Sequence, residues 1–147
     1  MIIRDARATD AARLAALAVQ LGYPATASEV EARLGKYEGN DDERVIVAEL
    51  SGEVAGWTSA ALVDHFHTPR CVEISGLVVD SALRGRGIGA ELLGEVRRWS
   101  EAKGVDCLRL RANVTRQDAH RFYTRYGFSN TKTQFVFELR LGKEDSR

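Results

Sequence analysis

The order of apolar and polar positions predicts that strands and helices alternate along the chain. Short, β-branched apolar segments indicate strands, whereas apolar residues repeated every three or four positions indicate helices. We expect strands over residues 2–6, 44–50, 54–63, 71–79, 106–112 and 134–141. We expect helices over about 10–21, 28–37, 88–103 and 116–126. This order is typical of a mixed α/β domain with one sheet and helices on its faces.

Local signals mark several ends of these elements. Ser28 and Glu31 have the spacing of a capping box at the start of the second helix. The dipeptide Ser51-Gly52 predicts a tight hairpin turn, and Thr115 is the expected cap of the last helix. Near the C-terminus, strict alternation predicts a half-buried antiparallel strand, whose apolar members are Phe135, Phe137, Leu139 and Leu141.

Length and charge narrow the class of protein. The chain has 147 residues, with 21 Lys and Arg against 21 Asp and Glu, so its formal net charge is zero. We expect a single domain over residues 1–141 and a polar tail over 142–147, since no linker divides the sequence. Without a basic surplus, nucleic acid is not an expected partner.

Membrane insertion, export and metal binding are not expected. No apolar run approaches the roughly 20 residues of a transmembrane helix, and charges at Arg4 and Asp5 disagree with a signal peptide. We therefore expect a cytoplasmic protein. Cys71 and Cys107 are interpreted as small buried hydrophobes rather than as a disulfide or a zinc site. His65 and His67 share a strand face without a third ligand, so no metal is expected.

A glycine-rich turn carries the clearest chemistry. The strand residues Leu77-Val78-Val79 precede the sequence Arg84-Gly85-Arg86-Gly87-Ile88-Gly89, which opens onto an amphipathic helix. Glycines permit positive φ, and the first turn of a helix leaves amide N–H groups unpaired, so the turn is suited to a phosphate group. The dinucleotide fingerprint and the P-loop both differ from this pattern. The alternative is a helix start that needs glycine for tight packing.

Two motifs together resemble one family. Arg84-x-x-Gly87-x-Gly89 behind its strand is similar to the acetyl-CoA-binding motif of the GNAT (Gcn5-related N-acetyltransferase) superfamily. Residues 119–128 resemble its second hallmark, A-x-x-[LF]-Y-x-x-x-G-[FY]. The resemblance covers nearly the whole chain. It implies the GNAT acyltransferase fold, a single mixed, mostly antiparallel sheet whose central strands splay apart, flanked by helices.

The resemblance also implies how acetyl-CoA would bind. The pyrophosphate would be held at the turn by Arg84 and by the backbone amides of Gly85, Arg86, Gly87, Ile88, Gly89 and Ala90. The pantetheine arm would pair like an added strand with Leu77, Val78 and Val79. Many members carry Asn seven residues before the conserved tyrosine. That position is Arg116 here, and the nearby Asn113 is the alternative contact.

Two residues occupy catalytic positions of the family. Glu73 matches the general base, and the alternative is a strand-end salt bridge with Arg70 or a neighbour. Strand alternation puts Glu73 on the same side as Ser75, Leu77 and Val79, unless a bulge at Gly76 resets the phase. Tyr123 matches the general acid, and the alternative is a purely structural tyrosine.

The expected activity is therefore acetyl transfer from acetyl-CoA to the primary amine of a small molecule, by direct attack on the thioester. Residues 113–123 are similar to aminoalkylphosphonate N-acetyltransferases, which suggests an amine with an anionic group that Arg116, Arg121 or His67 could recognise. Polyamines, aminoglycosides and amino acids stay open. The alternatives are a protein lysine or N-terminal acetyltransferase and a non-catalytic acyl-CoA-binding module. The last strand could also pair across a homodimer.

Overall fold

The computed structural model describes residues 1–142. Contacts divide the chain into two compact units, one over Met1–Arg111 and one that begins at Ala112. The expected tail over 142–147 lies outside the described residues except for Gly142. The second unit contains the helix α4 (Gln117–Tyr126). The first contains the strands β1 (Ile2–Asp5), β2 (Glu43–Leu50), β3 (Glu53–Val63), β4 (Cys71–Val79) and β5 (Leu108–Leu110), the helices α1 (Ala11–Leu21), α2 (Ala27–Gly35) and α3 (Ile88–Ala102), and the short 3-10 turns η1 (Ala8–Asp10) and η2 (Ser81–Leu83).

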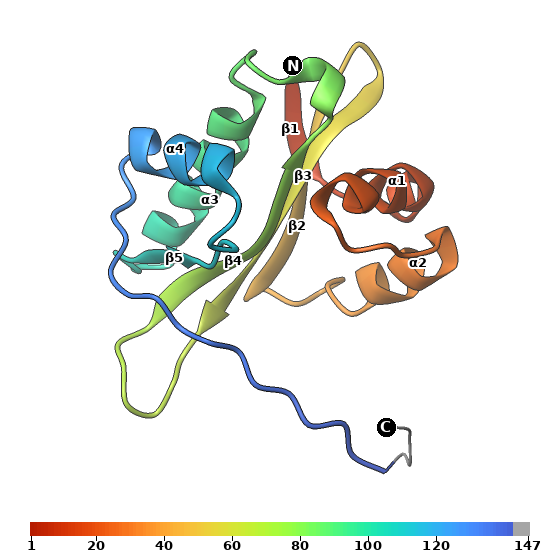
Figure 1. Ribbon diagram of the computed structural model, residues 1–147. Helices are drawn as coiled ribbons and strands as arrows, with labels where there is room; N and C mark the ends of the chain where they lie inside the picture. The colour runs from red at the N-terminus through yellow and green to blue at the C-terminus, as the bar shows by residue number, and fades with distance from the viewer. Residues whose placement is uncertain (143–147) are drawn as a thin grey trace. The chain divides into compact units, whose positions relative to one another are not determined.

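One mixed sheet organises the first unit, as the sequence predicts. Its strands lie in chain order, with β1 to β4 antiparallel and β5 parallel to β4 (Figure 1). β5 pairs with β4 only from Val72 to Ile74. Beyond Ile74, no described strand borders that edge of β4, because β5 ends at Leu110, and this leaves the open edge that the expected splay would provide.

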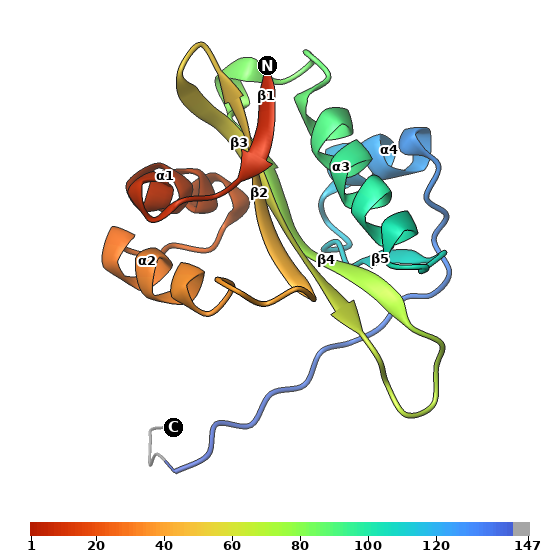
Figure 2. The same ribbon diagram turned by 180° about the vertical axis from the view of Figure 1, so that it is seen from behind.

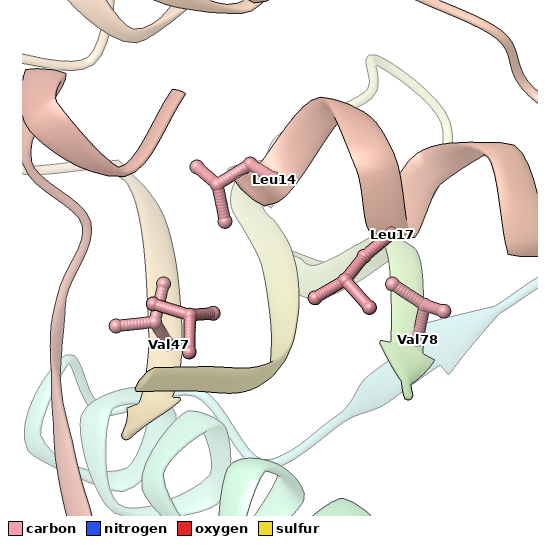
Figure 3. Packing of buried hydrophobic residues seen from close by; sticks show 5 residues of the cluster. Leu14, Leu17, Val47 and Val78 are labelled. Atoms are coloured by element: carbon pink, nitrogen blue, oxygen red, sulfur yellow. The ribbon is translucent and has the colours of Figure 1, made fainter. Parts of the chain in front are cut away.

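Helices cover both faces of this sheet. Figure 2 shows α1 and α2 on one side of the strands and α3 on the other. On the α1 side, Leu14 and Leu17 pack against Val47 and Val78 of the sheet (Figure 3). On the α3 side, the helical stripe is at most 2% exposed, and it consists of Ile88, Leu92, Leu93 and Val96. The core of this unit therefore has two apolar layers, one on each face of the sheet.

The hairpin turn between β2 and β3 forms where the sequence predicts it, whereas the capping box of α2 forms two residues earlier than predicted. Ser51 and Gly52 both have positive φ, 54° and 82°, as the tight hairpin between β2 and β3 requires. The capping box of α2 forms between Thr26 and Glu29 rather than between Ser28 and Glu31. Both pairs satisfy the same motif, and the pair nearer the N-terminus caps the helix.

The C-terminal part of the chain departs most from prediction. Arg116, not Thr115, precedes the first turn of α4. The predicted strand over 134–141 is wrong, because this segment has no regular structure, and its apolar side chains are 79–90% exposed. Alternation along one segment selects a face, but a strand also needs a hydrogen-bonding neighbour, and this segment has none among residues 1–142.

The two cysteines lie side by side. Cys71 is 1% exposed, and its thiol contacts Cys107 Sγ at 2.8 Å; both cysteines are free. Burial raises the pKa of the Cys71 thiol to about 12. The prediction that both are buried is wrong for Cys107, which is exposed just before β5 begins.

Residues 1–142 show features that bear on membrane insertion and metal binding. None of the helices in this range is both long and apolar enough to cross a membrane. The same residues bring together no group of three His, Cys, Asp or Glu side chains suited to a metal ion.

Candidate active site

The glycine turn after β4 owes its shape to two backbone conformations. Gly85 and Gly87 have φ of 82° and 79°, in the left-handed region that disfavours residues with a Cβ. A Cβ at either position would meet no atom within 4 Å. Conformation rather than tight packing therefore requires glycine here, which disagrees with the packing alternative.

This turn presents an uninterrupted row of backbone donors. The N–H groups of residues 85–90 have no acceptor among residues 1–142. The first helical hydrogen bond runs from Glu91 N–H to the Gly87 carbonyl at 3.0 Å. The N-terminus of α3 adds a partial positive charge, and Arg84 and Arg86 are exposed beside it. These features together fit an anionic group such as a pyrophosphate.

Side chains of α1 fix the start of the turn. The carboxylate of Asp80, directly after β4, accepts hydrogen bonds from Arg13 Nη2 at 2.6 Å and from Ala82 N–H at 3.1 Å. Gln20 Oε1 accepts the Ser81 N–H at 2.8 Å. The Arg13 guanidinium lowers the pKa of Asp80. Sequence analysis missed these anchors, since Arg13 and Asp80 are 67 positions apart and form no local motif.

The end of β4 has one free edge. Leu77, Val78 and Val79 pair with β3 on one side, and no described strand lies on the other. The expected pantetheine-binding residues therefore belong to a segment able to accept an extended chain as an added strand.

A β-bulge lies just before this free edge. The register of β3 and β4 shifts between Ser59 and Ala60, so that Ser59 opposes Gly76, Ala60 opposes Ile74, and Ser75 has no opposite residue. The Ser75 and Ser59 hydroxyls hydrogen-bond each other at 2.7 Å. One extra residue on a strand resets its two-residue alternation. The bulge that the sequence analysis considered at Gly76 therefore occurs one residue earlier, at Ser75.

The bulge changes which residues share a face with Glu73. Residues that are opposite each other on paired strands point to the same side of the sheet. Glu73 is opposite Ala61, and Val78 is opposite Trp57. Ala61 and Trp57 are four positions apart on β3, so their side chains point to the same side. Glu73 is thus on the α1 and α2 side with Val78. The exception to the predicted alternation therefore applies: Glu73 does not share a face with Leu77 and Val79, because the bulge lies between them.

Glu73 is paired with two arginines. Its carboxylate lies 3.0 Å from Arg111 Nη1 and 3.5 Å from Arg109 Nη1, and the side chain is 22% exposed. Arg70, the partner first considered, donates instead to the Lys103 carbonyl at 3.2 Å. The Glu73 carboxylate is therefore partly exposed to solvent, forms ion pairs with two arginines and lies on the same face of the sheet as Ser75.

In the second unit, Tyr123 lies in an aromatic group. Its ring centroid is 5.4 Å from that of Phe122 and 5.8 Å from that of Phe128. Burial raises the pKa of the Tyr123 phenol, with a smaller opposing effect from Arg116. The phenol is therefore protonated at neutral pH, the form that a proton donor requires.

Asn113 structures the loop before α4. Its side-chain oxygen accepts hydrogen bonds from Thr115 N–H at 3.0 Å and from the Thr115 hydroxyl at 2.9 Å. Its carbonyl oxygen contacts His120 Nε2 at 2.9 Å. The Asn113 oxygen is thus used within its own loop, as in an Asx turn.

Relatives of this chain share its sequence and fold. An aminoalkylphosphonate N-acetyltransferase from Salmonella typhimurium is 36% identical over 94 residues, which cover 63% of this chain and 61% of that enzyme. The match therefore spans less than two thirds of that relative. A glucosamine-6-phosphate N-acetyltransferase structure from Arabidopsis thaliana matches with TM-score 0.80 and 23% identity, over 95% of this chain and 98% of that one.

A structure of the aminoglycoside N-acetyltransferase AAC(6')-Iy in complex with CoA matches with TM-score 0.81 and 21% identity, over 95% of this chain and 94% of that one. At these identities the two structures show a common fold. Residues 10–128, which include the glycine turn and α4, match the family model described as the acetyltransferase (GNAT) family. The chain therefore belongs to the GNAT acetyltransferase family.

Proposed function

We propose that this protein transfers the acetyl group of acetyl-CoA to the primary amine of a small molecule. The observation that carries the proposal is the row of six N–H groups at residues 85–90 that have no acceptor among residues 1–142, in the turn that follows the free edge of β4. A pyrophosphate and an amide-rich pantetheine arm are the two chemical features that these surfaces suit. The names of the relatives, which act on an aminoalkylphosphonate, an aminoglycoside and an amino sugar phosphate, support a small amine.

The coenzyme contacts are divided between main chain and side chains. The amides of Gly85, Arg86, Gly87, Ile88, Gly89 and Ala90 hold the pyrophosphate. Arg84 and Arg86 add positive charge, and Leu77 to Val79 pair with the pantetheine arm. Asn113 and Arg116 are the two candidates for one further contact.

The reaction needs one proton acceptor and one proton donor. An alkylammonium ion must lose a proton before its nitrogen can attack the thioester, and Glu73 takes that proton, directly or through water. The C–N bond forms as the C–S bond breaks. Tyr123 donates its phenolic proton to the departing thiolate, and the second proton that the nitrogen loses as it becomes an amide returns to the phenolate.

Substitution of Tyr123 tests the acid separately from its aromatic packing. Tyr123→Phe keeps the ring contacts with Phe122 and Phe128 but removes the hydroxyl. We expect turnover to fall at least tenfold, since a positioned acid contributes roughly 10²–10⁴-fold, with CoA affinity unchanged. Unchanged turnover would leave Tyr123 with a structural role only.

Calorimetry and a thiol-release assay test the proposal as a whole. Calorimetry should show one acetyl-CoA site, weakened in Gly87→Ala because alanine disfavours the φ of 79°. Thiol release should then require a primary amine. Absence of coenzyme binding contradicts the proposal. Binding without turnover on any amine or peptide supports the non-catalytic module, and turnover on peptides alone supports the protein acetyltransferase.

A homodimer is part of the same proposal. The exposed apolar residues of segment 134–141 keep the alternation of a strand that lacks a neighbour. Light scattering over a range of concentrations tests for a dimer, and a constant monomer mass would exclude it.

A further inference from the structure

A cavity of about 240 Å³ lies between α1, α2 and the sheet of the first unit. This volume is below the roughly 300–1,000 Å³ of pockets for drug-sized ligands, so the cavity suits a smaller molecule. α2 has no fully buried residue, and its Val30 and Leu34 pack against the core only in part, which leaves room beside them. The lining consists mostly of leucine, alanine, valine and tyrosine side chains, and it includes Ala25, Arg33, Leu34, Trp57, Ser59 and Ser75.

The lining is apolar and aromatic apart from three residues. Trp57 is held in place because its indole N–H donates to the Leu14 carbonyl at 3.2 Å and its ring lies against Gly76. Ser59 and Ser75 satisfy each other by hydrogen bonding. Arg33, which is exposed, is the only charged residue of the lining.

The cavity adjoins the proposed chemistry. Ser75 belongs both to its lining and to the bulge of β4. Glu73 is two residues from Ser75 and on the same face of the sheet. A molecule whose apolar body occupies the cavity therefore has one end near the part of β4 that carries the proposed base.

We infer that the cavity selects the acceptor, and that the acceptor is a primary amine with one positive charge on an aromatic or branched aliphatic body, about the size of 2-phenylethylamine. This inference rests on the proposed function and names its substrate class. Apolar walls favour an apolar body, and burying sugar hydroxyls or a phosphonate against them carries a desolvation cost that only Arg33 and the two tyrosine hydroxyls of the lining could offset. The charge of Arg33 disfavours polyamines and aminoglycosides, which carry several positive charges.

This substrate class differs from the amine with an anionic group that the sequence suggests. His67, one of the residues considered for that group, is absent from the cavity lining.

A panel of amines tests the substrate class. With acetyl-CoA and the full chain, kcat/KM for 2-phenylethylamine should exceed the values for 2-aminoethylphosphonate, spermidine and kanamycin at least tenfold. A preference for any of these polar amines would overturn the inference and leave the proposed function intact. Coenzyme binding without turnover on any amine would instead count against the proposed function.

A matched pair of variants tests the location. Ala25 lines the cavity, whereas Ala27 is exposed on the first turn of α2 and does not line it. Ala25→Trp should raise KM for 2-phenylethylamine at least tenfold with acetyl-CoA affinity unchanged, and Ala27→Trp should leave KM unchanged. Circular dichroism confirms that both variants fold. Equal KM values in the two variants would overturn the inference.

Fluorescence gives a binding signal that does not depend on turnover. The chain has two tryptophans, and Trp99 on α3 is not in the cavity lining, so Trp99→Phe leaves Trp57 as the only reporter. Titration with 2-phenylethylamine should change Trp57 emission saturably, and 2-aminoethylphosphonate should not. A flat titration with 2-phenylethylamine would overturn the inference, whether or not acetyl transfer occurs.

Discussion

α3 and α2 cover opposite faces of one sheet in opposite ways. α3 buries five residues, four of them an apolar stripe that is at most 2% exposed, whereas α2 buries none and borders a cavity of about 240 Å³. We call the side of the sheet covered by α3 the packed face and the side covered by α1 and α2 the hollow face. The packed face stabilises the sheet, and the hollow face has room for a ligand. Stability and function are therefore expected to respond to substitutions on different faces.

The largest effect should follow a change on the hollow face that removes the proposed base. Glu73→Gln keeps the size of the side chain but abolishes its ability to take a proton. We expect kcat to fall about 10²–10⁴-fold, with a much smaller change in the free energy of unfolding. The control is Glu53→Gln, at an exposed residue at the start of β3. If Glu73 only pairs with Arg109 and Arg111, stability will drop while kcat stays unchanged.

The packed face should show the converse. Leu92 is 0% exposed on α3, whereas Leu34 on α2 is only partly buried and lines the cavity. Leu92→Ala should lower the free energy of unfolding by about 2–5 kcal/mol, because it leaves a void in a closed core. Leu34→Ala should cost less than about 1 kcal/mol. Urea unfolding of both variants measures the difference, and equal losses would contradict the contrast between the faces.

A smaller effect is expected where the sheet meets Trp57. A Cβ added at Gly76 would lie 2.9 Å from the Trp57 ring, whereas a Cβ at Gly35 would meet no atom within 4 Å. Gly76→Ala should therefore destabilise by about 1–3 kcal/mol, as overpacking does. Gly35→Ala, the matched control, should be neutral or slightly stabilising. Thermal unfolding measures both, and similar melting temperatures would show that Trp57 moves aside freely.

The smallest effect concerns how α1 is anchored on the hollow face. Arg4 of β1 pairs with Asp10 at 2.9 Å, and this guanidinium lowers the pKa of the Asp10 carboxyl below its model-compound value of 3.8. A lowered folded-state pKa stabilises the fold above pH 3.8, and this stabilisation is lost as the pH falls through the folded-state pKa.

Asp10→Asn should thus cost about 1 kcal/mol at pH 7. The difference from wild type should shrink as the pH falls below 3.8. Urea unfolding at a series of pH values checks this. A difference that does not vary with pH would show that the ion pair contributes nothing.

Local patterns in the sequence predict most of the first unit. The hairpin at Ser51-Gly52, the stripe of α3 and the glycine turn all depend on residues close together in the chain. The open edge beside the second half of β4 was expected from the family resemblance, and it is present because β5 pairs with β4 only from Val72 to Ile74.

Features that depend on exact register or on distant partners were not predictable, although a bulge near Gly76 was considered. The bulge at Ser75 follows from how β3 and β4 align, and it decides which residues share a face with Glu73. Arg109, which pairs with Glu73, lies 36 positions away from it. Segment 134–141 has the alternation of a strand but no neighbour among the described residues, and alternation alone does not supply one.

The donors of the glycine turn belong to peptide bonds, and this limits how they can be altered. Replacing Arg86 or Ala90 changes a side chain but leaves its N–H group in place, so an alanine scan would underestimate the importance of the turn. Only a change of backbone conformation, as at Gly85 or Gly87, can redirect these groups. Ester substitution of single peptide bonds by chemical ligation would remove them one at a time.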